Sequence, residues 1–134
     1  MYKDYPRADE WSGKVIGAAI EVHRLKGSGL VESIYEKCLM RELDLRGIPA
    51  ERQVVVPIEY KGLVFDEPLQ LDVYVDHCLI VELKAVESVL PVHKAQLMSY
   101  MKLMDAPVGL LINFHEPTLH EGISRMILPR ANLK

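Results

Sequence analysis

The sequence has 134 residues, enough for one domain, since domains usually take about 100–200 residues. Hydrophobic residues make up 49% and charged residues 26%, a balance that excludes disordered and fibrous chains. The formal net charge of −3 argues against a protein that coats nucleic acid non-specifically. The two cysteines, Cys38 and Cys78, are too far apart in sequence to suggest a zinc knuckle or a disulfide scaffold.

No membrane or export signal is visible in the sequence. The first residues contain no apolar stretch of the kind found in signal peptides, and no segment approaches the roughly 18 apolar residues of a membrane span. We therefore expect a cytoplasmic protein with no membrane partner.

Two helices are predicted first along the chain. Apolar residues recur at helical spacing from about residue 8 to 26 and again from about 31 to 46. Gly27-Ser28-Gly29 separates the two segments, and Gly47 stands where a glycine commonly ends a helix. The apolar face of the second helix comprises Val31, Ile34, Tyr35, Cys38, Leu39 and Leu43. Because the connection is short, we expect the two helices to pack as a pair.

Three strand-like segments follow the helical pair. Residues 48–60 are rich in β-branched side chains and end at a turn, Lys61-Gly62. Residues 69–75 alternate between apolar and polar side chains, with Leu69, Leu71, Val73 and Val75 on the apolar face. After a short turn at Asp76-His77, residues 78–86 form a further predicted strand.

The last part of the chain predicts a helix and a buried strand. Pro91 is placed to open a helix that runs to about Met104. The continuous apolar run over 108–114 is typical of a strand buried on both faces, and residues 120–128 fit a last strand or a short helix. The order of elements indicates an α/β fold in which helices flank a central mixed sheet.

Charged side chains occur where the strand at 78–86 should be buried. Glu82 and Lys84 share one face of this strand with Ile80. Antiparallel pairing across the short turn would bring Asp72 near Glu82, and two such carboxylates repel unless a cation lies between them. Two carboxylates with a carbonyl and waters suit Mg²⁺, while a nearby lysine can orient a water or offset charge on a phosphate. The alternative is the solvated face of an edge strand.

Two helices carry further candidates. Gln96 and Tyr100 lie one turn apart on the predicted helix after the strand and could hold a phosphate or a catalytic carboxylate, although a solvent-facing polar stripe has the same pattern. Glu32, at the start of the second helix, could be a third carboxylate that reaches the metal. A first-turn acid is also favoured by the helix dipole alone, by about 0.3–1 kcal/mol.

Together these residues resemble a known family. Gly29, Glu32 and Tyr35 fit G-x-x-E-x-x-Y, Asp72 with Glu82-Leu83-Lys84 fits a nuclease core, and Gln96 with Tyr100 fits Q-x-x-x-Y. The chain is similar over residues 16–128 to the GxxExxY protein family of the PD-(D/E)XK nuclease superfamily, although Leu71 stands where the motif has proline. The resemblance implies a restriction-endonuclease-like core in a single domain over 1–134, with a helical pair at about 8–46 and a sheet and site helix at about 48–128.

The resemblance also implies roles for the site residues. Asp72 and Glu82 would bind Mg²⁺ or Mn²⁺, together with the backbone carbonyl of Leu83 and the helix-borne Glu32. Lys84 would be the catalytic lysine. Gln96 and Tyr100 would complete the catalytic set.

The leading hypothesis is therefore a Mg²⁺-dependent nuclease that hydrolyses the phosphodiester bonds of DNA or RNA. The alternative is a non-catalytic module that keeps the nuclease fold and binds nucleic acid or a protein. A third reading is a structural or oligomeric protein whose charge pairs serve only specificity. A homodimer is compatible with a domain of this size, although the sequence does not show one.

Overall fold

A five-stranded mixed sheet forms the centre of the computed structural model, which describes residues 2–133. The helices are α1 (Tyr5–Lys26), α2 (Glu32–Leu45) and α3 (Pro91–Met104), with a short 3₁₀ helix, η1 (Leu119–Gly122). The strands are β1 (Ala50–Val55), β2 (Glu59–Tyr60), β3 (Leu63–Val64), β4 (Gln70–Val75), β5 (Leu79–Lys84), β6 (Val108–Asn113) and β7 (Ile123–Ile127). Their order in the sheet is β1-β4-β5-β6-β7. The predicted α/β class is thus confirmed.

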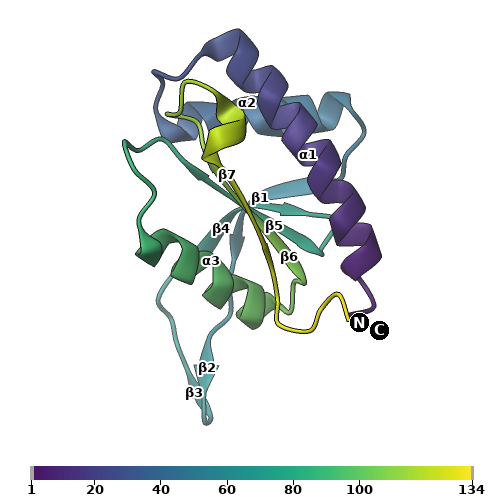
Figure 1. Ribbon diagram of the computed structural model, residues 1–134. Coiled ribbons are helices and arrows are strands. Elements are labelled where there is room, and N and C mark those ends of the chain that lie inside the picture. Colours follow the sequence, from purple (N-terminus) through teal and green to yellow (C-terminus); the bar gives the residue numbers. More distant parts are fainter. Residues whose placement is uncertain (1, 134) are drawn as a thin grey trace.

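Helices cover both faces of the sheet (Figure 1). One buried cluster joins α1 and α2 to the sheet, and a second joins α3 to its other face. The parallel pair β5 and β6 is connected through α3, as parallel strands require a crossover. At Gly109 of β6 a side chain would meet Met101 Sδ at 2.7 Å, so the glycine permits the close approach of α3. No helix within residues 2–133 is long and apolar enough to cross a membrane.

The predicted helices are close to the observed ones, with two differences. Helix α1 begins at Tyr5 rather than near residue 8, with Pro6 in its first turn. Helix α2 ends before Gly47, whose φ of 71° is the left-handed conformation expected there. Val31 and Ile34, predicted on the buried face, are 64% and 42% exposed. Val31 precedes the helix in an extended conformation, and Ile34 lies on the solvent side of the buried stripe.

The predicted strand at 48–60 is two strands. Pro57 offers no backbone N–H, and the chain leaves the sheet between β1 and β2. Strands β2 and β3 form a separate hairpin around the predicted Lys61-Gly62 turn, and this hairpin projects beyond the sheet (Figure 1). Residues 120–128, which fitted either a strand or a helix, form the end of η1 and then β7, the edge strand beside β6.

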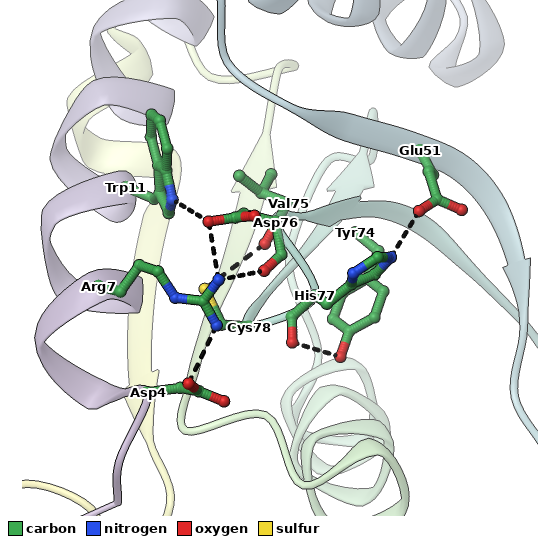
Figure 2. Close-up of polar contacts among 9 residues, drawn as sticks. All are labelled: Asp4, Arg7, Trp11, Glu51, Tyr74, Val75, Asp76, His77 and Cys78. Carbon is green, nitrogen blue, oxygen red and sulfur yellow. Dashed lines mark hydrogen bonds and ion pairs between the residues drawn. The ribbon is translucent and has the colours of Figure 1, made fainter.

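The turn between β4 and β5 is tied to α1 by side chains (Figure 2). Asp76 and His77 have φ values of 48° and 53°, the left-handed pair of a tight hairpin turn. The carboxylate of Asp76 accepts hydrogen bonds from Trp11 Nε1 at 3.0 Å and from Arg7 Nη1 at 2.9 Å. Tyr74 Oη donates to the carbonyl of His77 at 2.9 Å. These contacts hold the hairpin that carries the candidate site residues.

Candidate active site

Strands β4 and β5 separate where the two predicted carboxylates lie. The paired positions end at Val73 opposite Val81, and the same register continued by one step would set Asp72 opposite Glu82. At this position the two strands are joined by hydrogen bonds from backbone N–H groups to side-chain carboxylates. The N–H of Asp72 donates to Glu82 Oε2 at 2.8 Å, and the N–H of Leu83 donates to Asp72 Oδ2 at 2.8 Å. The two carboxylates therefore converge as the hairpin predicted.

Glu82 is an acidic side chain in the interior. It is 6% exposed, and burial, reinforced by the negative charge of Asp72, raises the pKa of Glu82 to about 9. Backbone donors occupy one oxygen of each carboxylate, Glu82 Oε2 and Asp72 Oδ2. The sheet thus places two carboxyl groups together in a region of low dielectric, where ionising both is unfavourable unless a cation binds between them.

Glu32 and Lys84 lie at the same place. A pocket of about 200 Å³ is lined by Glu32, Ser33, Glu36, Gln53, Asp72 and Leu83. Burial raises the pKa of Glu32, the charge of Asp72 adds to this, and the charge of Lys84 opposes it. Lys84 is the half-buried last residue of β5 and takes part in none of the ion pairs found among residues 2–133.

Tyr35 explains why α2 begins at Glu32. Its hydroxyl donates to the carbonyl of Gly27 at 2.5 Å and accepts from the N–H of Leu30 at 3.1 Å. Its ring is fully buried and stacks on Phe114, with centroids 4.4 Å apart. The tyrosine of the sequence motif therefore anchors the loop before α2, and this anchor presents Glu32 in the first turn.

Helix α3 contributes one of its two predicted residues to the site. Tyr100 is 6% exposed, and burial raises its pKa, with further contributions from the charges of Glu82 and Asp72. Gln96, one turn earlier, is exposed and makes no hydrogen bond with any described residue of the site. The structure thus brings Asp72, Glu82, Lys84, Glu32 and Tyr100 together and leaves Gln96 at the surface.

A comparison with protein families agrees with this geometry. Residues 9–126 match the family model described as the PD-(D/E)XK nuclease superfamily. The chain belongs to this superfamily. Its mixed five-stranded sheet with flanking helices is consistent with the restriction-endonuclease-like fold. No curated protein and no solved structure shows a significant match to the chain.

This member of the superfamily has the oxygen donors that a hard cation requires. Asp72 and Glu82 supply carboxylate oxygens, and Leu83, the residue directly after Glu82, lines the pocket together with Asp72 and carries a further backbone carbonyl. Mg²⁺ and Mn²⁺ prefer such donors, and Mg²⁺ keeps several waters. Within residues 2–133 no three His, Cys, Asp or Glu side chains are spaced to hold a metal by themselves. The donor set fits a cation that completes its shell with water and substrate.

Asn113, the last residue of β6, follows a buried apolar run, and from the sequence it could either cap a helix or hold the candidate site. It is fully buried, and its amide oxygen accepts from the N–H of Val86 at 3.1 Å and of His115 at 3.2 Å. Its amide nitrogen donates to the carbonyl of Val86 at 2.8 Å. These bonds fix the backbone at Val86, two residues after Lys84, so Asn113 holds the segment that follows β5.

Gln53 and Glu36 also line the pocket and were not predicted. Gln53 lies inside β1 with a φ of 54°, a conformation that costs a non-glycine residue roughly 1–2 kcal/mol. It stands across from Asp72, between the pairs Arg52–Val73 and Val54–Leu71. The sequence predicted Leu71 and Val73 on the same face of β4, and this is wrong at this irregularity. Val73 packs with α1 and α2, whereas Leu71 packs with α3 on the other face of the sheet.

Proposed function

We propose that the protein is a metal-dependent nuclease that hydrolyses the phosphodiester backbone of DNA or RNA. The observation that carries this proposal is the buried Glu82, held beside Asp72 with a pKa raised to about 9. Membership of the PD-(D/E)XK nuclease superfamily supports the reaction class. The motif of Gly29, Glu32 and Tyr35 further supports placing the chain in the GxxExxY family of that superfamily.

In this proposal the cation site is formed by side chains of β4 and β5. Asp72, Glu82 and the carbonyl of Leu83 would bind Mg²⁺ or Mn²⁺, with Glu32 on the pocket wall as a further acid. A divalent cation bound there would polarise the phosphoryl group and make a bound water more acidic. The backbone N–H groups of Asp72 and Leu83 keep the two carboxylates in place before the substrate arrives, so little reorganisation is needed.

Lys84 would act on the water and the phosphate. Its ammonium group stands at the end of β5, close enough to Glu32 and Glu82 to affect their pKa values. From there it would orient the attacking water and offset the negative charge that grows on the phosphate. Tyr100 would form the wall of the site on the side of α3. Gln96, at the exposed surface of that helix, would contact substrate rather than the carboxylates.

Replacing Lys84 tests this function. Labelled single- and double-stranded DNA and RNA are incubated with the protein while Mg²⁺ or Mn²⁺ is titrated. Lys84→Ala should lower the cleavage rate about 100-fold or more, because it removes a positive charge from the reacting phosphate. The matched control is Lys102→Ala, an exposed lysine in the last turn of α3, which should cleave like the wild type.

Equal background cleavage by the wild type and Lys84→Ala would exclude catalysis at this site. Binding of nucleic acid that is weakened by salt and survives both chelation and Asp72→Ala would instead support the non-catalytic module.

A further inference from the structure

Gln53 adopts a backbone conformation that its position in a strand does not explain. The other non-glycine residues with positive φ in residues 2–133 are Lys61, Asp76, His77, Asp105 and Arg130, and all lie in turns or at a helix end. Gln53 lies within β1, directly across from Asp72. Strained backbone of this kind persists where the surrounding structure holds it, and it gathers at functional sites.

A buried carboxylate holds the side chain of Gln53. Glu36, one turn after Glu32 on α2, is 5% exposed. Its Oε1 accepts from Gln53 Nε2 at 2.5 Å, and its Oε2 accepts from Arg52 Nη2 at 2.8 Å. A carboxylate can only accept, so Glu36 fixes which end of the amide turns toward it. The amide oxygen of Gln53 is therefore not directed at Glu36, and Gln53 lines the same pocket as Asp72.

We propose that Gln53 is a positioning residue of the cation pocket, and that it places an amide oxygen beside Asp72 to hold the water shell of a divalent ion. This inference rests on the proposed function. Mg²⁺ keeps several waters in protein sites, and those waters need acceptors on the pocket wall. Groups that orient metal ligands in this way typically contribute a factor of about 10–100 to affinity. A purely structural role would only tie β1 to α2.

Glycine at this position separates the two roles. Gln53→Gly removes the amide and also removes the backbone strain, since glycine adopts positive φ readily. Mn²⁺ is titrated into the whole protein by calorimetry, and urea unfolding is measured on the same samples without metal. The dissociation constant for Mn²⁺ should rise about tenfold while the unfolding midpoint changes little, because the relieved backbone strain offsets the lost hydrogen bond to Glu36. Gln53→Asn, which tolerates the left-handed backbone but has a shorter side chain, should give the same result.

Two controls interpret the titration. Gln70→Gly introduces glycine at an exposed position of β4 away from the pocket and should leave Mn²⁺ affinity unchanged. Asp72→Asn should weaken Mn²⁺ binding strongly. If it binds Mn²⁺ as tightly as the wild type, the proposed function and this inference both fail. If Asp72→Asn weakens binding but both Gln53 variants match the wild type, or lose affinity only in step with stability, this inference alone is overturned.

Discussion

Glu82 is the buried residue at which the proposed metal site and the stability of the fold have opposite requirements. It is almost wholly buried, and burial together with the charge of its neighbour Asp72 opposes its ionisation. Without a cation, Glu82 must stay protonated in the fold at neutral pH, and this lowers the free energy of unfolding. The side chain is nevertheless needed by the backbone, because it accepts the N–H of Asp72.

Glu82→Gln separates these two effects. The amide oxygen can still accept from the N–H of Asp72, while the amide nitrogen can donate to the neighbouring carboxylate. With a chelator present at pH 8, the free energy of unfolding should therefore rise by about 1–2 kcal/mol over the wild type, as measured by urea denaturation. Mn²⁺ should stabilise the wild type but not the variant.

The matched variant Glu82→Ala leaves the N–H of Asp72 without its acceptor and should lower stability by about 1–3 kcal/mol. A Glu82→Gln protein that is less stable than the wild type would show that the carboxylate is not under repulsion.

Some residues of the site could be predicted because their signal is local. The polar residues Asp72, Glu82 and Lys84 interrupt apolar strands, and a two-residue turn fixes how those strands meet. Gln53 has no such signal, and for Asn113 the sequence leaves open whether the residue caps a helix or holds the site. Their roles depend on contacts with α2 and with the chain after β5, which are distant in sequence. Gln96 lies on a polar helix stripe, and because such a stripe looks the same whether it faces a site or solvent, the sequence does not predict that this side chain is exposed.

At the scale of elements, short turns and side-chain anchors set where each strand and helix begins. The helical pair, the Asp76-His77 turn, α3 and the buried β6 were all predicted from periodicity and turn residues. The strand at 48–60 was predicted too long because β-branched residues continue past the point where Pro57 ends the pairing. The irregularity at Gln53 was missed, since nothing in the local sequence marks a left-handed glutamine.

The anchor of the β4–β5 turn makes stability depend on pH. The hydrogen bond from Trp11 and the charge of Arg7 lower the pKa of Asp76 below its ordinary value of 3.8. A lowered pKa means that the contribution is present above the ordinary value and is lost as pH falls through the lowered one. Asp76→Asn, which keeps the left-handed turn, should lower the free energy of unfolding by about 0.5–1.5 kcal/mol at pH 7.

Urea denaturation of the wild type and Asp76→Asn at pH 7, 4 and 2 would follow this difference, which should shrink toward the lowest pH. Asp66→Asn, an exposed acid beyond β3, is the control and should show little difference at any pH. A difference between the wild type and Asp76→Asn that stays constant from pH 7 to pH 2 would contradict the role of the Asp76 charge.

At the scale of the whole molecule, one sheet joins two cores. Leu110 packs among the residues of α1 and α2, whereas Leu111 packs against α3 on the other face of β6. Both are fully buried. Because both cores share the same strands, we expect them to lose structure together.

Leu110→Ala and Leu111→Ala test this expectation. Each should lower the free energy of unfolding by about 2–5 kcal/mol, through lost apolar contacts and the cavity left behind. Trp11, the single tryptophan, reports on α1 by fluorescence, and far-ultraviolet circular dichroism reports on the whole chain. The two signals should change in one coincident transition in both variants. A Leu111→Ala protein whose dichroism falls before its fluorescence would show two separately stable parts.

The opening between β4 and β5 also bears on how such a sequence can drift. Where two strands are paired along their whole length, most strand-forming residues are tolerated, because the backbone N–H and C=O groups bond to each other across the strands. Here two acids provide acceptors that the backbone lacks, so an apolar replacement of either one strands an N–H of the opposite strand. A related protein that has lost the proposed catalytic activity can keep the fold most readily if both Asp72 and Glu82 are replaced together and backbone pairing between β4 and β5 is restored. Paired loss of the two acids, rather than gradual erosion, is the trace that inactivation should leave among related sequences.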